Sequence, residues 1–127
     1  MSQRKIFIVE EDLGFADKLK AFLKERPQWE VTWFATGEDA IQSAHRDPHV
    51  VIIDYHLDQL KGQGMNGIEA MKEIRKIAPE AHCWFLSAQK HYGVALQTIS
   101  EGAEGYIIKD ENALNEIGKI LDELVEL

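Results

Sequence analysis

Acids, a hydroxyl group and a lysine stand directly after the short apolar segments of this chain. Glu10 and Glu11 follow the first segment, Asp54 ends a later one, and Ser87 and Lys109 follow two more. A carboxylate such as Asp54 can act as a nucleophile toward phosphorus. Neighbouring acids can hold a divalent cation, while an ammonium group can neutralise phosphoryl oxygens. These residue types predict transfer of a phosphoryl group to a carboxylate of the protein itself.

This chemistry requires the acids to lie close together, which carries an electrostatic cost. Neighbouring strands lie about 4.8 Å apart. Two carboxylates at ~4 Å repel by about 4 kcal/mol at an effective dielectric of 20. A cation must therefore compensate them, and Mg²⁺ suits a few carboxylates, waters and phosphoryl oxygens. Lys109 is a second compensator, since it can pair with Asp54 or with a phosphoryl group attached there.

Five β-branched segments alternate with five helical patterns along the chain. Strands are expected at 5–9, 30–34, 50–54, 82–86 and 105–108, and helices at 13–25, 36–47, 66–77, 92–101 and 112–124. The third and fifth strands are continuously apolar, which predicts helices on both of their faces.

The alternation predicts an α/β fold with a doubly wound, five-stranded parallel sheet in three layers. The expected strand order is 2-1-3-4-5, with helices on both faces of the sheet. Ligands of such sheets bind beyond the carboxyl ends of the strands, at the switch point between the first and third strands. Glu10 and Asp54 follow or end those two strands, which places the predicted chemistry at that point.

Composition limits the other classes of function. A chain of 127 residues predicts one domain over 1–127. With 14 Lys and Arg against 22 Asp and Glu, the net charge is −8, which disfavours direct nucleic-acid binding. The single cysteine, Cys83, excludes an internal disulfide. No apolar run approaches the ~18 residues that span a bilayer. We therefore expect a cytoplasmic protein that does not enter the membrane.

Four motifs in order resemble the receiver domain of bacterial two-component response regulators. They are the acidic segment 6–12, the acceptor segment 50–54, the hydroxyl segment 85–88 and the lysine segment 102–109. The resemblance covers essentially the whole chain. It implies that Asp54 is the phosphoacceptor, supplied by a sensor histidine kinase or a phosphotransfer protein. Such a protein is not a conventional enzyme, although it catalyses phosphoryl transfer to its own aspartate and the hydrolysis that follows.

The resemblance also assigns the cofactor and its ligands. Glu10 and Glu11 match the acids of a Mg²⁺ site, with Glu11 at the position of the direct ligand. Asp54 and the backbone carbonyl of His56 would complete the set of protein ligands.

Further residues match the switch of the family. Ser87 and Lys109 would hold the phosphoryl oxygens, and Tyr106 matches the switch aromatic. His56 and Gln89 would tune the lifetime of the phosphoryl-aspartate. The fourth helix, fifth strand and fifth helix would form the output surface for a downstream protein target or output domain. A homodimer through the fourth and fifth helices, or through the first and fifth, is an open alternative.

Three positions depart from the family pattern. The direct metal position holds Glu11 where Asp is usual, so the carboxylate reaches further; Asp12 could replace it if the first strand ended later. Gly67 lies 13 residues after Asp54, against eight in the pattern. The longer loop, Asp58–Met65, is expected to be mobile and to shape partner choice or water access. Asp110 follows the lysine where Pro is common.

Two other functions remain as alternatives. A pseudo-receiver would use the fold only as a protein-binding module, independent of phosphorylation, and Glu11 would mark a damaged metal site. A Mg²⁺-dependent phosphohydrolase with an aspartyl nucleophile is disfavoured, because His56 stands where such enzymes carry a second Asp and no cap domain is present.

Overall fold

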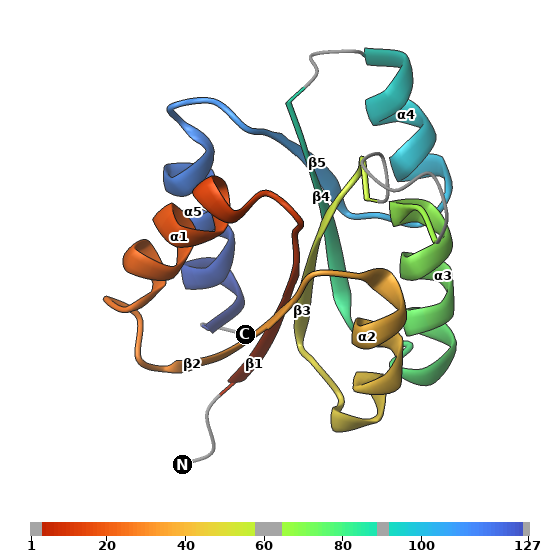
Figure 1. The fold of residues 1–127 in the computed structure, drawn as a ribbon, viewed down its shortest axis with the longest axis horizontal. Helices are drawn as coiled ribbons and strands as arrows, with labels where there is room; N and C mark the ends of the chain where they lie inside the picture. Colours follow the sequence, from red (N-terminus) through yellow and green to blue (C-terminus); the bar gives the residue numbers. More distant parts are fainter. Residues whose placement is uncertain (1–3, 58–64, 89–91, 126–127) are drawn as a thin grey trace.

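The computed structural model describes residues 4–57, 65–88 and 92–125. Five strands and five α-helices alternate along them (Figure 1). The strands are β1 Arg4–Val9, β2 Trp29–Phe34, β3 Val50–Asp54, β4 His82–Ser87 and β5 Gly105–Ile108. The helices are α1 Leu13–Leu23, α2 Gly37–Gln42, α3 Gly67–Ile77, α4 Tyr92–Ser100 and α5 Ala113–Val125, and a 3-10 helix, η1, covers Ala44–Arg46. Most ends lie within two residues of the predicted ones, and the expected helix over 36–47 divides into α2 and η1.

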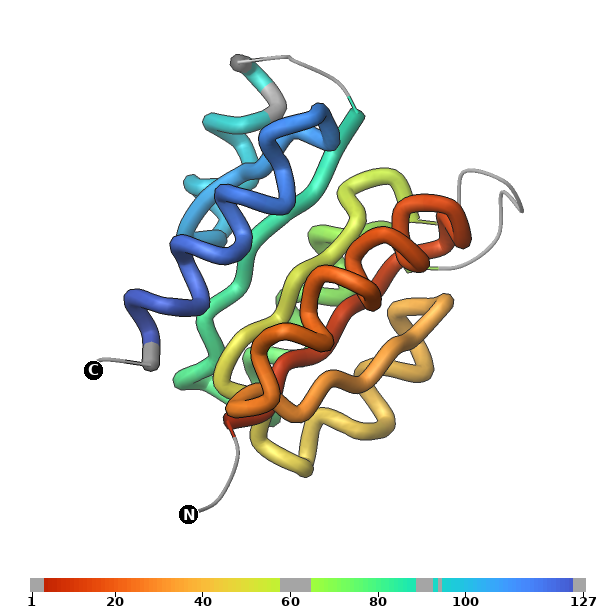
Figure 2. Tube along the Cα trace, turned by 90° about the vertical axis from the view of Figure 1, so that its left-hand side faces the viewer, coloured from red at the N-terminus to blue at the C-terminus, as the bar shows by residue number. Residues whose placement is uncertain are grey.

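The sheet is parallel with the order β2-β1-β3-β4-β5, which confirms the predicted topology. Helices α1 and α5 cover one face, and α2, α3 and α4 cover the other (Figures 1 and 2). Side chains alternate between the two faces of β1, so Ile6 and Ile8 pack toward α1 and α5 while Phe7 and Val9 pack toward α2 and α3. Within the described residues, no helix is long and apolar enough to cross a bilayer.

Burial distinguishes the central strand from the edge strand. Every residue of β3 is buried, as its continuous apolar sequence predicts for a strand covered on both faces. Strand β5 is different, because Tyr106 and Ile108 alternate with buried neighbours and are only half-buried. The predicted helices do lie against both faces of β5, since it contacts α4 and α5, but they leave it less buried than β3. Its apolar sequence does not reveal that it ends the sheet, with a neighbouring strand on one side only.

Side-chain caps stabilise the first turns of α3 and α1, the helices that follow β3 and β1. Asn66 accepts a hydrogen bond from the backbone of Glu69, and the Glu69 carboxylate accepts one from the backbone of Asn66. This reciprocal capping box satisfies donors at the start of α3. Asp12 caps α1 in a similar way, with its side chain accepting from Gly14 and Phe15. Both caps are polar residues immediately before helices, where such side chains satisfy the free backbone N–H groups of the first turn.

The single cysteine lies in the core and is expected to be chemically inert in the folded state. Burial raises the pKa of Cys83 to about 12, and only the thiolate is nucleophilic. At pH 8 the thiolate fraction is then roughly 1,000-fold smaller than for an ordinary thiol. We expect Ellman's reagent to react with the native protein at least that much more slowly than with the protein in guanidinium. Comparable rates in the two states would contradict the burial of Cys83.

Candidate functional site

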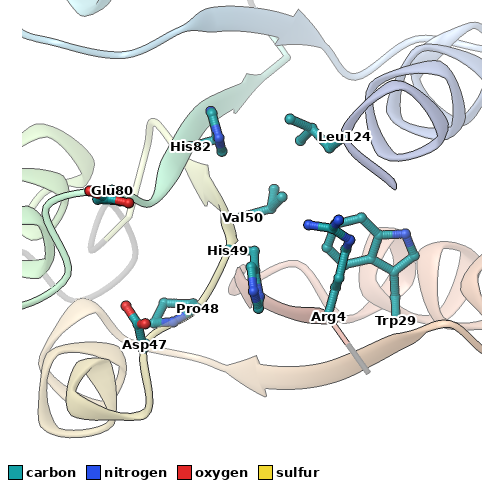
Figure 3. A pocket seen from close by; sticks show the side chains of 9 residues that line it. All are labelled: Arg4, Trp29, Asp47, Pro48, His49, Val50, Glu80, His82 and Leu124. Atoms are coloured by element: carbon teal, nitrogen blue, oxygen red, sulfur yellow. The ribbon is translucent and has the colours of Figure 1, made fainter. Parts of the chain in front are cut away.

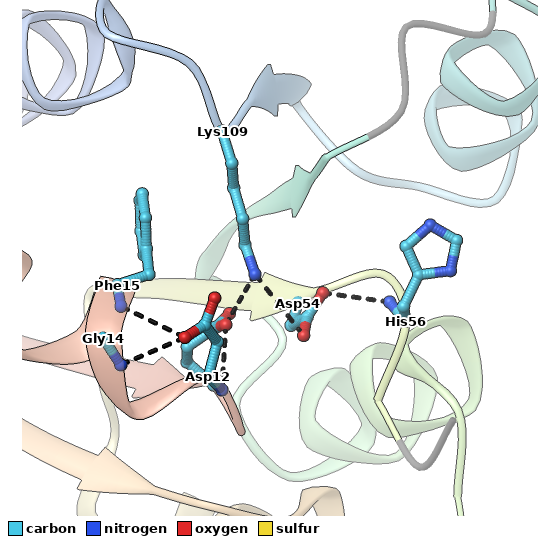
Figure 4. Close-up of polar contacts among 7 residues, drawn as sticks. Asp12, Gly14, Phe15, Asp54, His56 and Lys109 are labelled. Atoms are coloured by element: carbon cyan, nitrogen blue, oxygen red, sulfur yellow. Dashed lines mark hydrogen bonds and ion pairs between the residues drawn. The ribbon is translucent and has the colours of Figure 1, made fainter. Parts of the chain in front are cut away.

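Four of the predicted residues stand at one edge of the sheet, where the strands end. Glu10 follows β1, Asp54 ends β3, Ser87 ends β4 and Lys109 follows β5. Figure 4 shows Lys109 and Asp54 pointing toward one another at this edge. In a parallel sheet these ends share one edge, so residues up to 99 positions apart come into contact. The Lys109 backbone N–H donates to the Ser87 carbonyl over 2.8 Å, which fixes the lysine beside β4.

The ammonium group of Lys109 lies between two carboxylates. Its Nζ donates to Glu10 Oε1 at 2.5 Å and lies 3.6 Å from Asp54 Oδ2. It also lies 5.3 Å from the centre of the Phe15 ring. All three charged side chains are nearly buried, with exposures of 11% for Lys109, 0% for Glu10 and 9% for Asp54. Sequence reasoning paired Lys109 with Asp54 and missed that Glu10 is the closer partner.

The burial of Glu10 is electrostatically unfavourable. The pKa of Glu10 is raised from 4.5 to about 7, chiefly by burial and also by the neighbouring charge of Asp54. The hydrogen bond and positive charge of Lys109 act in the opposite direction, but they do not cancel the burial. Oxygen Oε2 of Glu10 is buried and accepts no hydrogen bond from the residues that the structure describes. A buried carboxylate oxygen without a partner suits a site that gains a cation.

Asp54 is held in place by the backbone around it. Its Oδ1 accepts a hydrogen bond from the His56 N–H at 3.0 Å. Behind it, α3 begins so close that a Cβ on Gly67 would lie 2.8 Å from the Asp54 carbonyl oxygen and 2.9 Å from a Phe85 ring carbon. Glycine is therefore required at position 67 for this approach of the backbones. The second carboxylate oxygen, Oδ2, remains on the side of Lys109.

The three consecutive acids after β1 take different positions. Glu10 is buried, Glu11 is half-buried, and Asp12 is exposed. The Asp12 carboxylate accepts from the N–H groups of Gly14 at 3.0 Å and Phe15 at 3.3 Å, so it serves α1. Since β1 ends at Val9, the alternative in which a later strand end lets Asp12 replace Glu11 does not apply.

The donor set suits a cation that needs few protein ligands. Within the described residues, no group of three or more His, Cys, Asp or Glu side chains is arranged to hold a metal ion. Yet once Glu10 and Asp54 are both ionised, they present two negative charges to the single positive charge of Lys109, and Glu10 Oε2 has no partner among those residues. Mg²⁺ commonly takes one or two carboxylates and fills its remaining positions with water and phosphate oxygens. The residues present therefore fit Mg²⁺ by charge and donor type.

An aromatic cluster extends from the acceptor to the expected switch residue. The ring of Tyr55 lies 6.5 Å from that of Tyr106 and 6.0 Å from that of Phe85, in edge contacts. The backbone N–H of Tyr55 donates to the Leu86 carbonyl at 2.8 Å, which anchors this residue to β4. Sequence reasoning missed Tyr55, although an aromatic residue directly after the acceptor was a visible signal. Ser87, the residue expected to couple to Tyr106, is fully buried.

Of the two residues expected to tune hydrolysis, the structure describes His56 but not Gln89. The ring of His56 points away from Asp54 (Figure 4), and its Nε2 is buried without a partner among the described residues. Gln89 lies outside the described residues. Residues 58–64 also lie outside them, so the expected mobility of the Asp58–Met65 loop is untested. At its end, the Met65 N–H donates to Glu38 Oε1 at 3.4 Å.

Comparisons with known proteins agree on one family. The model of the response regulator receiver domain matches residues 6–122. The chemotaxis protein CheY of Thermotoga maritima is 29% identical over 124 residues, which cover 91% of this chain and 98% of CheY. The transcriptional regulatory protein DegU of Brevibacillus brevis is 27% identical over 123 residues, 92% of this chain but 49% of DegU. The chain thus spans nearly all of one relative and about half of the other.

A solved structure shares the fold at lower identity. The receiver domain of the sensor histidine kinase PA1611 from Pseudomonas aeruginosa superposes with a TM-score of 0.80 and is 23% identical, over 98% of this chain and 99% of that one. That structure is described with a magnesium ion coordinated in its active-site cleft.

Proposed function

This chain belongs to the response regulator receiver family, and we propose that it is a phosphorylation-controlled switch of two-component signalling with Asp54 as its phosphoacceptor. The observation that carries the proposal is the contact of one buried ammonium group, Lys109, with two buried carboxylates, Glu10 and Asp54. The phosphodonor would be a sensor histidine kinase or a phosphotransfer protein in the cytoplasm.

The acceptor reaction follows from the arrangement around Asp54. Oxygen Oδ2 attacks the phosphorus of a phosphohistidine, the new O–P bond forms, and the P–N bond breaks to release the imidazole. The Nζ of Lys109 lies 3.6 Å from this oxygen and can form hydrogen bonds to the phosphoryl oxygens as their negative charge increases. The His56 N–H holds Oδ1 and so orients the carboxylate. Ser87 would donate its hydroxyl to the attached phosphoryl group.

A magnesium ion would complete the charge balance. Glu10, Glu11, Asp54 and the backbone carbonyl of His56 would hold it, and it would supply positive charge to the transferring phosphoryl oxygens. The net negative charge of the buried pair of carboxylates supports this assignment. Among these proposed ligands, Glu11 departs from the family pattern, because its side chain is one methylene longer than the usual aspartate.

The output of the switch would pass through α4, β5 and α5. Phosphorylation would draw Ser87 toward the phosphoryl group and Tyr106 inward, past the ring of Tyr55. On α4, the side chains of Leu96 and Ile99 are 69% and 49% exposed, which supports a protein-binding surface there. The partner would be a downstream protein or an output domain.

The proposal is tested by direct phosphorylation. We expect the protein incubated with Mg²⁺ and acetyl phosphate to gain a single phosphoryl adduct in its intact mass, and EDTA to prevent it. Absence of any adduct would favour a pseudo-receiver, for which the departure at Glu11 is the supporting observation. Continuous turnover of diverse phosphate esters would instead indicate a hydrolase.

The lifetime of the adduct is expected to depend on His56. The ring of His56 points away from Asp54, so the tuning role requires it to turn toward the path of the attacking water; His56→Ala should then change the dephosphorylation rate by roughly 3- to 10-fold. The rate is measured as loss of adduct after removal of acetyl phosphate. His45→Ala, at an exposed position in η1, is the matched control and should leave the rate unchanged. Gln89→Ala is expected to act like His56→Ala, and unchanged rates in both variants would remove the tuning role.

A further inference from the structure

The edge strand β2 directs alternate backbone groups away from the sheet. Strand β1 lies on one side of it, and in the part of the chain that the structure describes no strand lies on the other (Figure 1). The Phe34 carbonyl accepts the N–H of Glu10 at 3.0 Å, so the even-numbered residues of β2 face β1. Because this direction alternates along a strand, the N–H and C=O groups of Val31 and Trp33 point to the open edge. Such an edge can accept a further strand.

A groove lies beside this edge, between β2 and the last turns of α1. It has a volume of about 380 Å³. Its accessible lining residues come from α1, the connection after it and β2, and they are Lys20, Lys24, Pro27, Val31 and Trp33. Trp29, at the start of β2 opposite Arg4 (Figure 3), is only 3% exposed and forms part of the floor. The groove thus combines an apolar surface with a row of available backbone groups.

The charge of the groove is positive. Lys20 and Lys24 are exposed, and neither forms an ion pair with a residue that the structure describes. The Nζ of Lys20 lies 5.2 Å from the centre of the Trp33 ring, so this ammonium group is held over the groove. No acid is among the lining residues, although the whole chain carries a net charge of −8. A ligand of this groove therefore gains by carrying negative charge.

The spacing of the two lysines matches an extended segment. Four residues of a helix advance about 6 Å along its axis. Side chains on one face of a strand lie about 6.8 Å apart. We propose that β2 binds an acidic extended segment of a partner protein as a further, antiparallel strand. Residues of the segment exchange backbone hydrogen bonds with Val31 and Trp33, and two acids placed two residues apart reach Lys20 and Lys24.

A second copy of this chain suits the groove less well. Pairing of two β2 edges would place Trp29, Val31 and Trp33 of the second copy along the groove, and none of these is an acid. It would also bring the lysines of the two grooves toward one another, and like charges repel. The groove contains none of the residues around Asp54, so the proposal does not rest on phosphorylation.

The test uses the ¹⁵N-labelled full chain and the peptide acetyl-Thr-Glu-Thr-Glu-Thr-Leu-Thr-amide. Its alternate residues place two acids and one leucine on the groove side. In the free protein we expect the amides of Val31 and Trp33 to exchange with solvent at least about tenfold faster than that of Ile52 in the central strand. The peptide should shift both signals saturably, with a Kd of about 1 mM or tighter, and should slow their exchange.

Two altered peptides separate the contributions. Replacing both Glu by Lys should weaken binding at least about tenfold, although the net charge of −8 by itself favours the basic peptide. N-methylation of the second Glu removes the N–H that would donate to the β2 edge, and should also weaken binding at least about tenfold.

Variants of the protein identify the groove. Lys20→Glu and Lys24→Glu should each weaken binding of the acidic peptide at least about fivefold. Lys119→Glu, an equally exposed change on α5 outside the groove, should leave it unaltered, as should Asp54→Asn.

The proposal is overturned if the acidic peptide produces no saturable shifts, or if the basic or N-methylated peptide binds as tightly. It is equally overturned if both lysine variants bind the acidic peptide like the unmodified protein. Protection of the Val31 and Trp33 amides that rises with protein concentration, without any peptide, would assign the edge to a second copy instead.

Discussion

Asp54→Asn should abolish the phosphoryl adduct formed with Mg²⁺ and acetyl phosphate, with a loss of at least about a hundredfold in adduct yield. The amide has no carboxylate oxygen to attack phosphorus, yet its oxygen can still accept the His56 N–H that holds Oδ1 at 3.0 Å. The variant should therefore fold normally. Intact mass spectrometry measures the yield, and a thermal unfolding curve checks the fold.

The matched control for this variant is Asp17→Asn. Asp17 is an exposed residue of α1, and the same change from carboxylate to amide there should leave the adduct yield unaltered. An adduct of undiminished yield in Asp54→Asn would place the phosphoryl group on another residue. The proposed acceptor, and the reaction built on its contact with Lys109, would then be wrong.

The second large effect concerns stability and its dependence on pH. In metal-free buffer at pH 8, Glu10→Gln should raise the free energy of unfolding by about 1–3 kcal/mol. The pKa of Glu10 is raised to about 7 in the folded protein, chiefly by burial, from an ordinary value of 4.5. The folded state therefore binds this proton more tightly than the unfolded state does. Stability attributable to Glu10 is full below about pH 4.5 and is lost as the pH rises through about 7.

The size of the stabilisation should accordingly follow pH. At pH 4.5 the difference between Glu10→Gln and the unmodified protein should nearly vanish, and above pH 7 it should reach its plateau, as measured by urea unfolding in EDTA. Glu123→Gln, an exposed change on α5, controls for the loss of one negative charge. A difference independent of pH, or a destabilised Glu10→Gln at pH 8, would show that Lys109 fully compensates the buried carboxylate.

The same variant should separate stability from function. Glu10 Oε2 has no partner among the described residues, and this oxygen is one of the proposed ligands of Mg²⁺. Removing it should stabilise the metal-free fold while raising the Mg²⁺ concentration at which phosphorylation is half-maximal. A gain in stability with a loss of function is expected where a site holds like charges together for a ligand. The bound ligand, and not the folded protein alone, compensates the repulsion between those charges.

The fold could be predicted from the sequence because its signals are local. The β-branched segments and the alternation of strand and helix patterns each depend on residues within one turn or one strand. Right-handed crossovers then leave few sheet orders for five parallel strands, and the observed β2-β1-β3-β4-β5 is the expected one. Since parallel strands end at one edge, the gathering of Glu10, Asp54 and Lys109 also followed from the sequence.

The partners of those side chains were decided only by the tertiary structure. Whether Lys109 pairs with Glu10 or Asp54 depends on the register of β1, β3 and β5, and strands that are distant in sequence set that register. Burial of Glu10 beside a half-buried Glu11 depends in the same way on which side of the strand end faces the neighbouring strands. The partial burial of Tyr106 and Ile108 in β5 also arises from packing between distant elements. A sequence encodes which groups can interact; the distances that choose among those interactions, and hence their electrostatic energies, exist only once the sheet is assembled.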